Sequence, residues 1–371
     1  MIISHTSFEE FAANCELARR DGINVVPVSC RMAFDTLTPV LAYLRLRHGN
    51  AASALLESVT PGRRSRYSYV AVNPRDRYEL ADGAARLTAF AYGGGNRQTS
   101  TISGAPLEAL REYLKGHRTF APSPGIPPFT GGWIGYLGYE VVRQIEPTVP
   151  PHGGQPLGIP DACLDRYDCV LVIDHFTNQA DVVANVELAP DAETRSLFTA
   201  AAARIAAVLA GLQRPGPEGI GQAIQPVPIT ASSTPAQYQA AVSQVLEHIR
   251  AGDTFQTVIA QHFSVPLQVS SLDIYRALRQ INPSPYMFHL DFGQGVQLVG
   301  ASPEVLVEVT GGVVRIRPIA GTRRRGRTPE ENEQLQRELL DDKKERAEHR
   351  ILIDLARNDL GRVAQTGPVE V

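Results

Sequence analysis

The tightest constraint on the fold is a two-glycine turn in the carboxyl-terminal half of the chain. In EVLVEVTGGVVRIRPIAG, residues 304–321, alternating apolar runs flank Gly311-Gly312. Paired glycines between such runs are typical of a β-hairpin, because they accept the positive φ angles of a tight turn. VQLVGAS, residues 296–302, predicts a strand before the hairpin, and a helical pattern follows it. Strands followed by helices, without β-α-β alternation, predict an α+β fold.

The segment preceding these strands has a clear helix start and stop. Thr234 is the predicted N-cap, Pro235 takes the first helical position, and Gly252 ends the helix. The sequence DTFQTVIAQHFSV, residues 253–265, alternates between two faces and predicts a strand.

The amino-terminal half mixes short helices and strands. TGGWIGYLGYE, residues 130–140, alternates glycine with bulky side chains, which predicts strands packed closely against another backbone. Further predictions are a helix at 107–115, strands at 169–175 and 181–188, and a strand, turn and strand at 55–74.

The 371 residues suffice for about two domains. A stretch rich in Pro, Gly and Ser predicts a linker at 213–234, between an amino-terminal region, 1–212, and a second domain, 235–371. Val369 and Val371 alternate with polar residues, as in a strand that is just beginning. We therefore expect the second domain to be incomplete in this chain.

Composition argues against several classes of protein. The net charge of −3 lacks the basic excess of a nucleic-acid binder. The amino terminus has no apolar signal segment, and SLFTAAAARIAAVLAGL, residues 196–212, contains Arg204 and is short for a bilayer span. We expect a cytoplasmic protein with no membrane contact, in which the four cysteines, none in a C-x-x-C pair, are reduced thiols.

The charged segment LLDDKKERAEHRILIDLARNDLGRV, residues 339–363, is helical in pattern. Its spacing places Glu345, Glu348 and His349 on one broad face with Leu352. The simpler interpretation is a solvated, salt-bridged surface helix. The alternative is that Glu348 binds a divalent cation such as Mg²⁺, which would neutralise a carboxylate beside an apolar layer.

Two other segments invite a functional interpretation. In PIAGTRRRGRTPEEN, residues 318–332, Gly321, Thr322 and four arginines could cradle an anion, or could form an ordinary solvated basic loop. INPSPYMFHLDFG, residues 281–293, is a rigid turn that could line a pocket for an aromatic ligand. On its own it is better explained as a turn that fills the core.

Taken in order, six segments resemble the chorismate-utilising enzymes, and among them component I of the anthranilate synthases. They are LLES at 55–58, GDTFQTVIAQ at 252–261, NPSPYMF at 282–288, GASPE at 300–304, PIAGT at 318–322 and KERAEHRILIDLARNDLGRV at 344–363. The resemblance implies a fold of large, mostly antiparallel sheets with helices on the outside. It also implies a reaction in which chorismate and ammonia give anthranilate and pyruvate, the first step of tryptophan biosynthesis.

The resemblance also implies roles for particular residues. Glu348 would bind Mg²⁺, and Gly321 and Thr322 would contact chorismate. Relatives that use water carry Lys at the position of Gln256, and component I of aminodeoxychorismate synthase carries Lys at Ala320. A glutamine is no general base and an alanine no nucleophile, so both positions favour anthranilate synthase; the aminodeoxychorismate enzyme is the alternative.

Regulation and assembly follow from the same resemblance. Ser58, Pro285, Tyr286 and Met287 would bind tryptophan as a feedback inhibitor, with Glu57 and Asn282 nearby. Ammonia would come from a glutamine amidotransferase, component II, in a hetero-oligomer.

The family's catalytic histidine and second Mg²⁺ glutamate would fall beyond residue 371, so no catalytic residue is assigned. RRR also replaces the family's usual RPR after PIAGT. One further alternative is therefore a chain without activity that retains tryptophan or partner binding.

Overall fold

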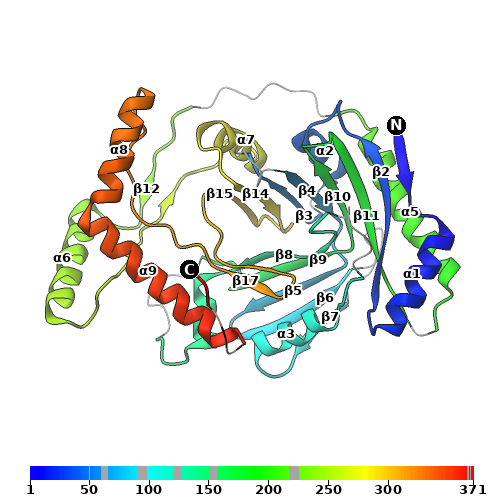
Figure 1. Ribbon diagram of the computed structural model, residues 1–371, viewed down its shortest axis with the longest axis horizontal. Helices are drawn as coiled ribbons and strands as arrows, with labels where there is room; N and C mark the ends of the chain where they lie inside the picture. Colours follow the sequence, from blue (N-terminus) through cyan, green and yellow to red (C-terminus); the bar gives the residue numbers. More distant parts are fainter. Residues whose placement is uncertain are drawn as a thin grey trace. The chain divides into compact units, whose positions relative to one another are not determined.

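The largest element of this computed structural model is an eight-stranded sheet in which every neighbouring pair of strands is antiparallel (Figure 1). The structure describes residues 1–49, 51–59, 66–90, 98–120, 127–150, 157–189, 191–216, 225–365, 367 and 369–371. The strands, in spatial order, are β1 (Ile2–His5), β2 (Val25–Ala33), β11 (Gln179–Glu187), β10 (Cys169–Asp174), β4 (Tyr67–Val72), β3 (Ser53–Glu57), β14 (Tyr286–Asp291) and β15 (Gln297–Ser302).

A second, five-stranded antiparallel sheet faces the first. Its spatial order is β7 (Gln98–Ile102), β6 (Ala84–Ala89), β5 (Asp76–Ala81), β9 (Ala162–Tyr167) and β8 (Gly132–Leu137). Gly135 shows why β8 carries glycines: a Cβ there would lie 2.0 Å from the carbonyl oxygen of Cys163 on β9. The close backbone approach predicted for residues 130–140 is confirmed.

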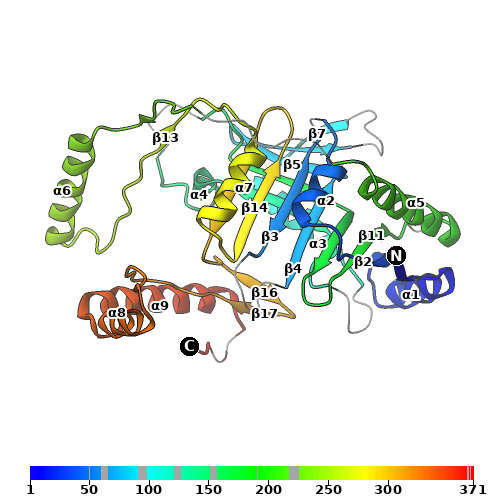
Figure 2. The ribbon, with the colours of Figure 1, turned by 90° about the horizontal axis from the view of Figure 1, so that it is seen from above.

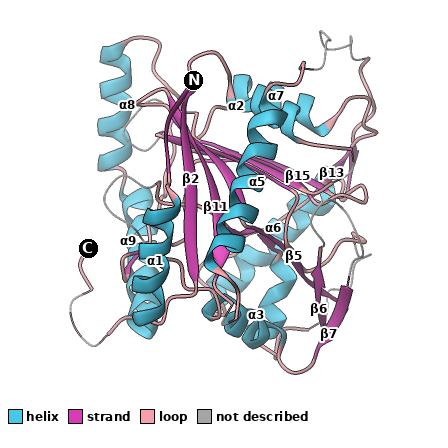
Figure 3. Cartoon of the chain, turned by 90° about the vertical axis from the view of Figure 1, so that its right-hand side faces the viewer, coloured by secondary structure: helices cyan, strands magenta, loops and turns pink. Residues whose placement is uncertain are grey.

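The core between the two sheets comes from alternate residues of their strands. Val170 and Val172 of β10 and Leu290 of β14 meet Ile134 and Tyr167 of the five-stranded sheet. The other face of the large sheet is covered by the helices α1 (Phe8–Arg20), α2 (Pro39–Leu46) and α5 (Thr194–Leu212) (Figure 3). The helix α3 (Pro106–Lys115) packs Leu110 on the outer face of the small sheet. This arrangement confirms the α+β prediction.

Among the described helices, α5 is the one whose length and apolar composition would suit a membrane span. It nevertheless packs on β2, β10 and β11 and against α1 and α2, as a member of the helical layer.

Residues 1–217 and 278–371 form one compact unit. Its remaining described elements are η1 (Tyr139–Val141), α4 (Val142–Ile145), the hairpin β16 (Glu308–Thr310) and β17 (Val313–Arg315), and the helices α8 (Pro329–Asp341) and α9 (Lys343–Val363). The hairpin turns at Gly311 and Gly312, with φ of 58° and 78°, as predicted.

The second unit, residues 218–277, contains α6 (Pro235–Ala251), β12 (Thr230–Ala231), β13 (Phe263–Ser264) and most of α7 (Ser271–Ile281). The predicted ends of α6 are confirmed: Thr234 forms a capping box with Gln237, and Gly252 is left-handed with φ of 85°. The predicted domain limits at 212 and 235 stay predictions, and part of the predicted linker, residues 217–224, lies outside the described residues.

Three local predictions were wrong. Of the strand predicted at 253–265, only Phe263–Ser264 is a strand; its described partner is the two-residue β12, and most of the rest is exposed. The alternating pattern was present, but a strand also needs a neighbour to bond. Residues 286–291, interpreted as a turn, form β14 within the large sheet. Residues 369–371 have no strand structure.

Candidate functional site

The segment ending at Gly321-Thr322 lies directly against the helices α8 and α9. Gly321 has φ of 79°, and a Cβ there would come within 2.9 Å of Glu345 Oε2 and 3.0 Å of Leu339 Cδ1. Both the backbone conformation and the close packing therefore require glycine. Thr322 follows with an exposed side chain, so its hydroxyl is available to a ligand.

Arg323 ties this segment to the junction of the two helices. Its guanidinium donates to Glu345 Oε1 at 3.1 Å, to Asp342 Oδ2 at 2.7 Å and to the carbonyl oxygen of Thr322 at 3.0 Å. The hydrogen bond from Arg323 to Glu345 is the main cause of the raised pKa of Arg323, and the hydrogen bond to Asp342 adds to it. The carboxylate of Glu345 is thus neutralised on a half-buried helix face by an arginine of this chain.

The predicted anion cradle of four arginines is therefore partly occupied by the protein itself. Arg323 binds the carboxylates just described, and Arg324 Nη2 lies 2.7 Å from Glu331 Oε1. From the sequence alone, these arginines were expected to be free to bind an anion. The carboxylates that pair with Arg323 lie about 20 residues later in the chain, so no local pattern indicated the pairing.

Glu348 lies one helical turn beyond Glu345 on α9 and is half-buried. Among the described residues, no hydrogen bond or ion pair engages its carboxylate, in contrast to that of Glu345. The described residues contain no group of three or more His, Cys, Asp or Glu side chains placed to hold a metal. Glu348 fits Mg²⁺ as a single oxygen ligand, in a site that water and an anionic substrate would complete.

The four residues predicted to bind tryptophan come together where β3 and β14 pair (Figure 2). Met287 is the register partner of Glu57, and the amide of Val59 donates to the carbonyl oxygen of Ser284 at 3.2 Å. Ser58 lies between these two contacts, level with Pro285 and Tyr286. Met287 is 1% exposed and Tyr286 is 40% exposed, and because they are consecutive residues of β14 their side chains point to opposite faces of the sheet.

Sequence reasoning missed Arg279 of α7. Its Nη2 lies 3.3 Å from Oε1 of Glu57, whose side chain is buried. Burial is the main cause of the lowered pKa of His175. The charge of Glu57 acts to raise this pKa, and that of Arg279 acts to lower it. Glu57 had been expected as a neighbour of Ser58, but the cation that balances it comes from a helix 222 residues away and leaves no local signal.

The two positions that the resemblance suggested as discriminating between reactions lie apart in the chain. Ala320 immediately precedes Gly321 and is half-buried. Gln256 belongs to the second unit and is exposed.

Comparison with known proteins adds a family context. Residues 51–371 match the family model described as chorismate binding enzyme. The chain is 40% identical over 98% of its length to anthranilate synthase component 1 of Cereibacter sphaeroides, and 43% identical over 91% to that of Thermus thermophilus. It spans 72% and 68% of those two relatives, and 66% of a third from Streptomyces coelicolor, 40% identical over 97% of this chain.

Solved structures agree with the sequence comparison. Anthranilate synthase component I from Streptococcus pneumoniae superposes with a TM-score of 0.68 at 31% identity, covering 90% of this chain and 69% of that one. The isochorismate synthase MenF from Escherichia coli, at 13% identity, has a TM-score of 0.55 over 96% of this chain and 69% of its own, and so shares the fold.

Proposed function

We propose, because this chain belongs to the chorismate binding enzymes, that it is component 1 of an anthranilate synthase. The protein would convert chorismate and ammonia into anthranilate, pyruvate and water, the first step of tryptophan biosynthesis. The observation that carries the proposal is the identity of 40–43% with relatives of that name over more than nine-tenths of the chain. The proposal places the reaction in the cytoplasm and assigns ammonia supply to a glutamine amidotransferase subunit.

The proposed roles follow the local chemistry. Thr322 would donate its exposed hydroxyl to chorismate, and the backbone at Gly321 would approach the substrate closely because it has no side chain. Arg323 would hold this segment against α9, so that Thr322 and Glu348 keep a fixed separation. When bound at Glu348, Mg²⁺ would supply positive charge for the substrate carboxylate.

Ammonia as the nucleophile is supported by Gln256 and Ala320, two positions at which this chain does not carry a lysine. Gln256 has no basic nitrogen with which to deprotonate water, whereas neutral ammonia is a nucleophile without such help. Ala320 cannot form a covalent adduct with the ring, as a lysine could. Both features favour direct attack by ammonia.

A fluorescence assay tests the function. The protein in its full reading frame, supplied with chorismate, an ammonium salt and Mg²⁺, should release anthranilate, identified by its emission and by chromatography. A different aromatic or amino-cyclohexadiene product would overturn the proposal in favour of another member of the family.

Glu348 provides the sharper test of the metal site. Glu348→Gln removes the charge that holds the metal, so we expect anthranilate formation to fall at least about a hundredfold, in keeping with several kcal/mol for a metal-charge contribution. Calorimetric titration with Mg²⁺ in the presence of chorismate should lose its binding signal. Asp354→Asn, an exposed carboxylate elsewhere on α9, is the matched control. Near-normal turnover and binding in Glu348→Gln would remove Glu348 from the site.

A further inference from the structure

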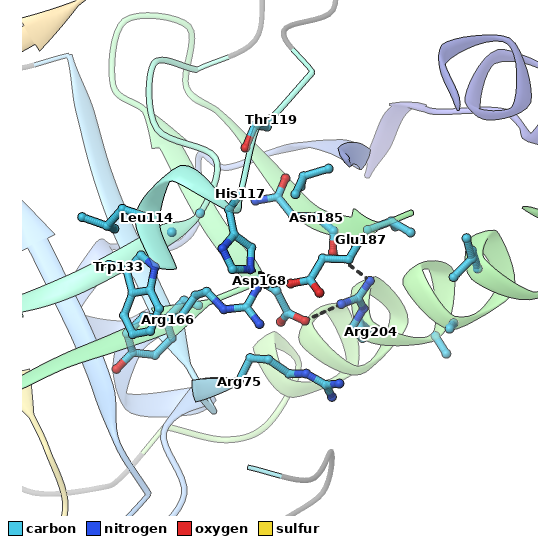
Figure 4. Close-up of a pocket in the computed structure, with 18 of the residues that line it drawn as sticks. Arg75, Leu114, His117, Thr119, Trp133, Arg166, Asp168, Asn185, Glu187 and Arg204 are labelled. Atoms are coloured by element: carbon cyan, nitrogen blue, oxygen red, sulfur yellow. Dashed lines mark hydrogen bonds and ion pairs between the residues drawn. The ribbon is translucent and has the colours of Figure 1, made fainter. Parts of the chain in front are cut away.

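A cavity of about 740 Å³ in the first unit is lined by none of the residues assigned above to chorismate, Mg²⁺ or tryptophan (Figure 4). Its walls come from β8 and β9 of the five-stranded sheet, from β11 of the large sheet and from α5. This volume is in the range of protein sites for small organic ligands, roughly 300–1,000 Å³. The cavity is therefore large enough to bind a small molecule of its own.

One wall of the cavity is an apolar face of α5. Leu197, Ala200, Ala203 and Ala207 lie on this face, and the three alanines are exposed. Their short side chains leave an even surface, and their exposure means that a ligand can enter from solvent on this side. A flat ring covers such a surface better than a branched group does, because more of its atoms reach contact distance.

The charged side chains around the cavity are already paired within the protein. Arg166 bonds both Glu187 and Asp76. His117 shares Glu187, and its Nε2 lies 3.2 Å from Oε1 of that carboxylate. These four side chains form one network in which each basic group lies beside a carboxylate.

The other cations of the lining are engaged as well. Arg204 Nη1 donates to Asp168 Oδ2 at 2.6 Å. Arg75, which also lines the cavity, has an interaction partner within the protein. A charged ligand would have to break one of these pairs or lie without an opposite charge beside it, and both are costly. The lining therefore favours a neutral ligand.

Two buried polar atoms of the lining residues have no hydrogen-bond partner among the described residues. They are a donor, Nε1 of Trp133, and an acceptor, Oδ1 of Asn185. Asn185 is 8% exposed, and its Nδ2 donates to the carbonyl oxygen of Thr130 at 3.1 Å. Turning this amide over would bring Oδ1 against that carbonyl oxygen, so the unpaired atom is the acceptor. The lining thus lacks one acceptor and one donor, which a ligand could supply.

The side chains of Trp133 and Asn185 belong to neighbouring parts of the wall. A Cβ on Gly131 would lie 2.5 Å from Asn185 Nδ2, and Trp133 follows Gly131 by two residues, at most about 7 Å of backbone. Neither unpaired atom is exposed to solvent, so the lining side chains must rotate slightly before a ligand can reach them. A carboxamide carries an acceptor and a donor on one carbon, and it carries no charge.

We propose that this cavity is a binding site for a small neutral aromatic carboxamide. The ring would lie on the alanine face of α5, the amide oxygen would accept from Trp133 Nε1, and the amide N–H would donate to Asn185 Oδ1. Both unpaired atoms would then be satisfied without the loss of an ion pair. The site is separate from the residues proposed for catalysis and regulation, and it does not depend on the reaction that the protein catalyses.

A series of three ligands tests the chemistry without altering the protein. Benzamide is the probe, followed by calorimetry and by the emission of Trp133, the single tryptophan of the chain. Benzoate has nearly the same shape but carries a charge, and acetophenone has nearly the same shape but has no N–H to donate. Benzamide should bind saturably, and each analogue should bind at least about fivefold more weakly, in keeping with the loss of one hydrogen bond.

Two results would overturn the proposal. One is the lack of saturable binding up to about 10 mM benzamide, a range that extends beyond millimolar affinity. The other is binding of benzoate or acetophenone as tight as that of benzamide.

A pair of neighbouring substitutions locates the binding. Ala203→Leu fills the cavity from α5, whereas Ala202→Leu adds the same side chain at an exposed position that does not line it. We expect the first to weaken benzamide binding at least about tenfold, because the added side chain takes the place of the ring, and the second to leave binding unchanged. Circular dichroism melting checks that both variants fold. If folded Ala203→Leu binds benzamide as the unsubstituted protein does, the cavity is not the site.

Discussion

At the scale of single residues, His117 is a side chain whose charge makes stability depend on pH. It follows the carboxyl end of α3, where Nδ1 lies 2.9 Å from the carbonyl oxygen of Tyr113 and Nε2 lies 3.2 Å from Glu187. With an acceptor at each nitrogen, the imidazolium form is favoured. The hydrogen bond to Glu187 is the main reason why the pKa of His117 is raised, and the same bond is the main reason why that of Glu187 falls to about 2.

The sign of the pH dependence follows. A histidine whose pKa is higher in the folded than in the unfolded protein stabilises the fold fully below its unfolded pKa of about 6.5. That contribution is lost as pH rises through the folded pKa. Urea unfolding should therefore show a free energy that declines above about pH 6.5, and His117→Gln should flatten this decline. His5→Gln, at an exposed residue of β1, is the control. An unchanged slope in His117→Gln would refute the assignment.

At the scale of elements, β8 and β9 depend on backbone contact through glycine. Gly135→Ala would place a methyl group 2.0 Å from the carbonyl oxygen of Cys163 and 2.6 Å from Leu164 Cα. Because both of these atoms belong to the backbone, the strands must separate to make room for the methyl group. We therefore expect the free energy of unfolding to fall by about 1–3 kcal/mol. Gly361→Ala on α9 meets no atom within 4 Å and should be neutral or stabilising. Equal stability of the two variants would contradict this account.

The helices α8 and α9 and the segment before them form a second dependent group. Arg323→Ala removes the contacts to Asp342 and Glu345, so the amides of residues 320–324 should exchange with deuterium faster. Arg325→Ala removes an exposed side chain that has no ion pair within the described chain and should leave exchange unchanged. Equal exchange in both variants would show that the segment is held by packing alone.

These elements also show how far sequence reasoning reaches. The hairpin at Gly311-Gly312 and the ends of α6 were predictable because their signals are local: a turn or a cap acts within a few residues. The strand predicted at 253–265 failed because strand formation depends on a partner from elsewhere. For the same reason the sequence suggested Ser58 and Met287 through resemblance alone, and could not pair Glu57 with Arg279.

At the scale of the whole molecule, the group around Ser58 lies in the large sheet, in a part of the fold separate from α9. If tryptophan binds there, its effect on turnover is a coupling between sites, commonly worth 1–3 kcal/mol. Ser58→Ala or Met287→Thr should therefore raise the tryptophan concentration for half-inhibition by about 5- to 150-fold, with uninhibited turnover largely kept. Phe176→Ala, at an exposed ring, is a control expected to leave inhibition intact. Lost turnover with unchanged inhibition would mean that the regulatory group is elsewhere.

The pairing of β3 with β14 has a consequence for biosynthesis. Glu57 and its register partner Met287 are separated by about 230 residues, so β3 lacks one neighbour until β14 has left the ribosome. At about 5–20 residues per second, that interval lasts roughly 10–50 seconds. During it, the nascent chain presents the edge of Ser53–Glu57, with its leucines, to any other unpaired strand. Slower translation would lengthen this exposure, so the yield of soluble protein should depend on chaperones that bind nascent chains.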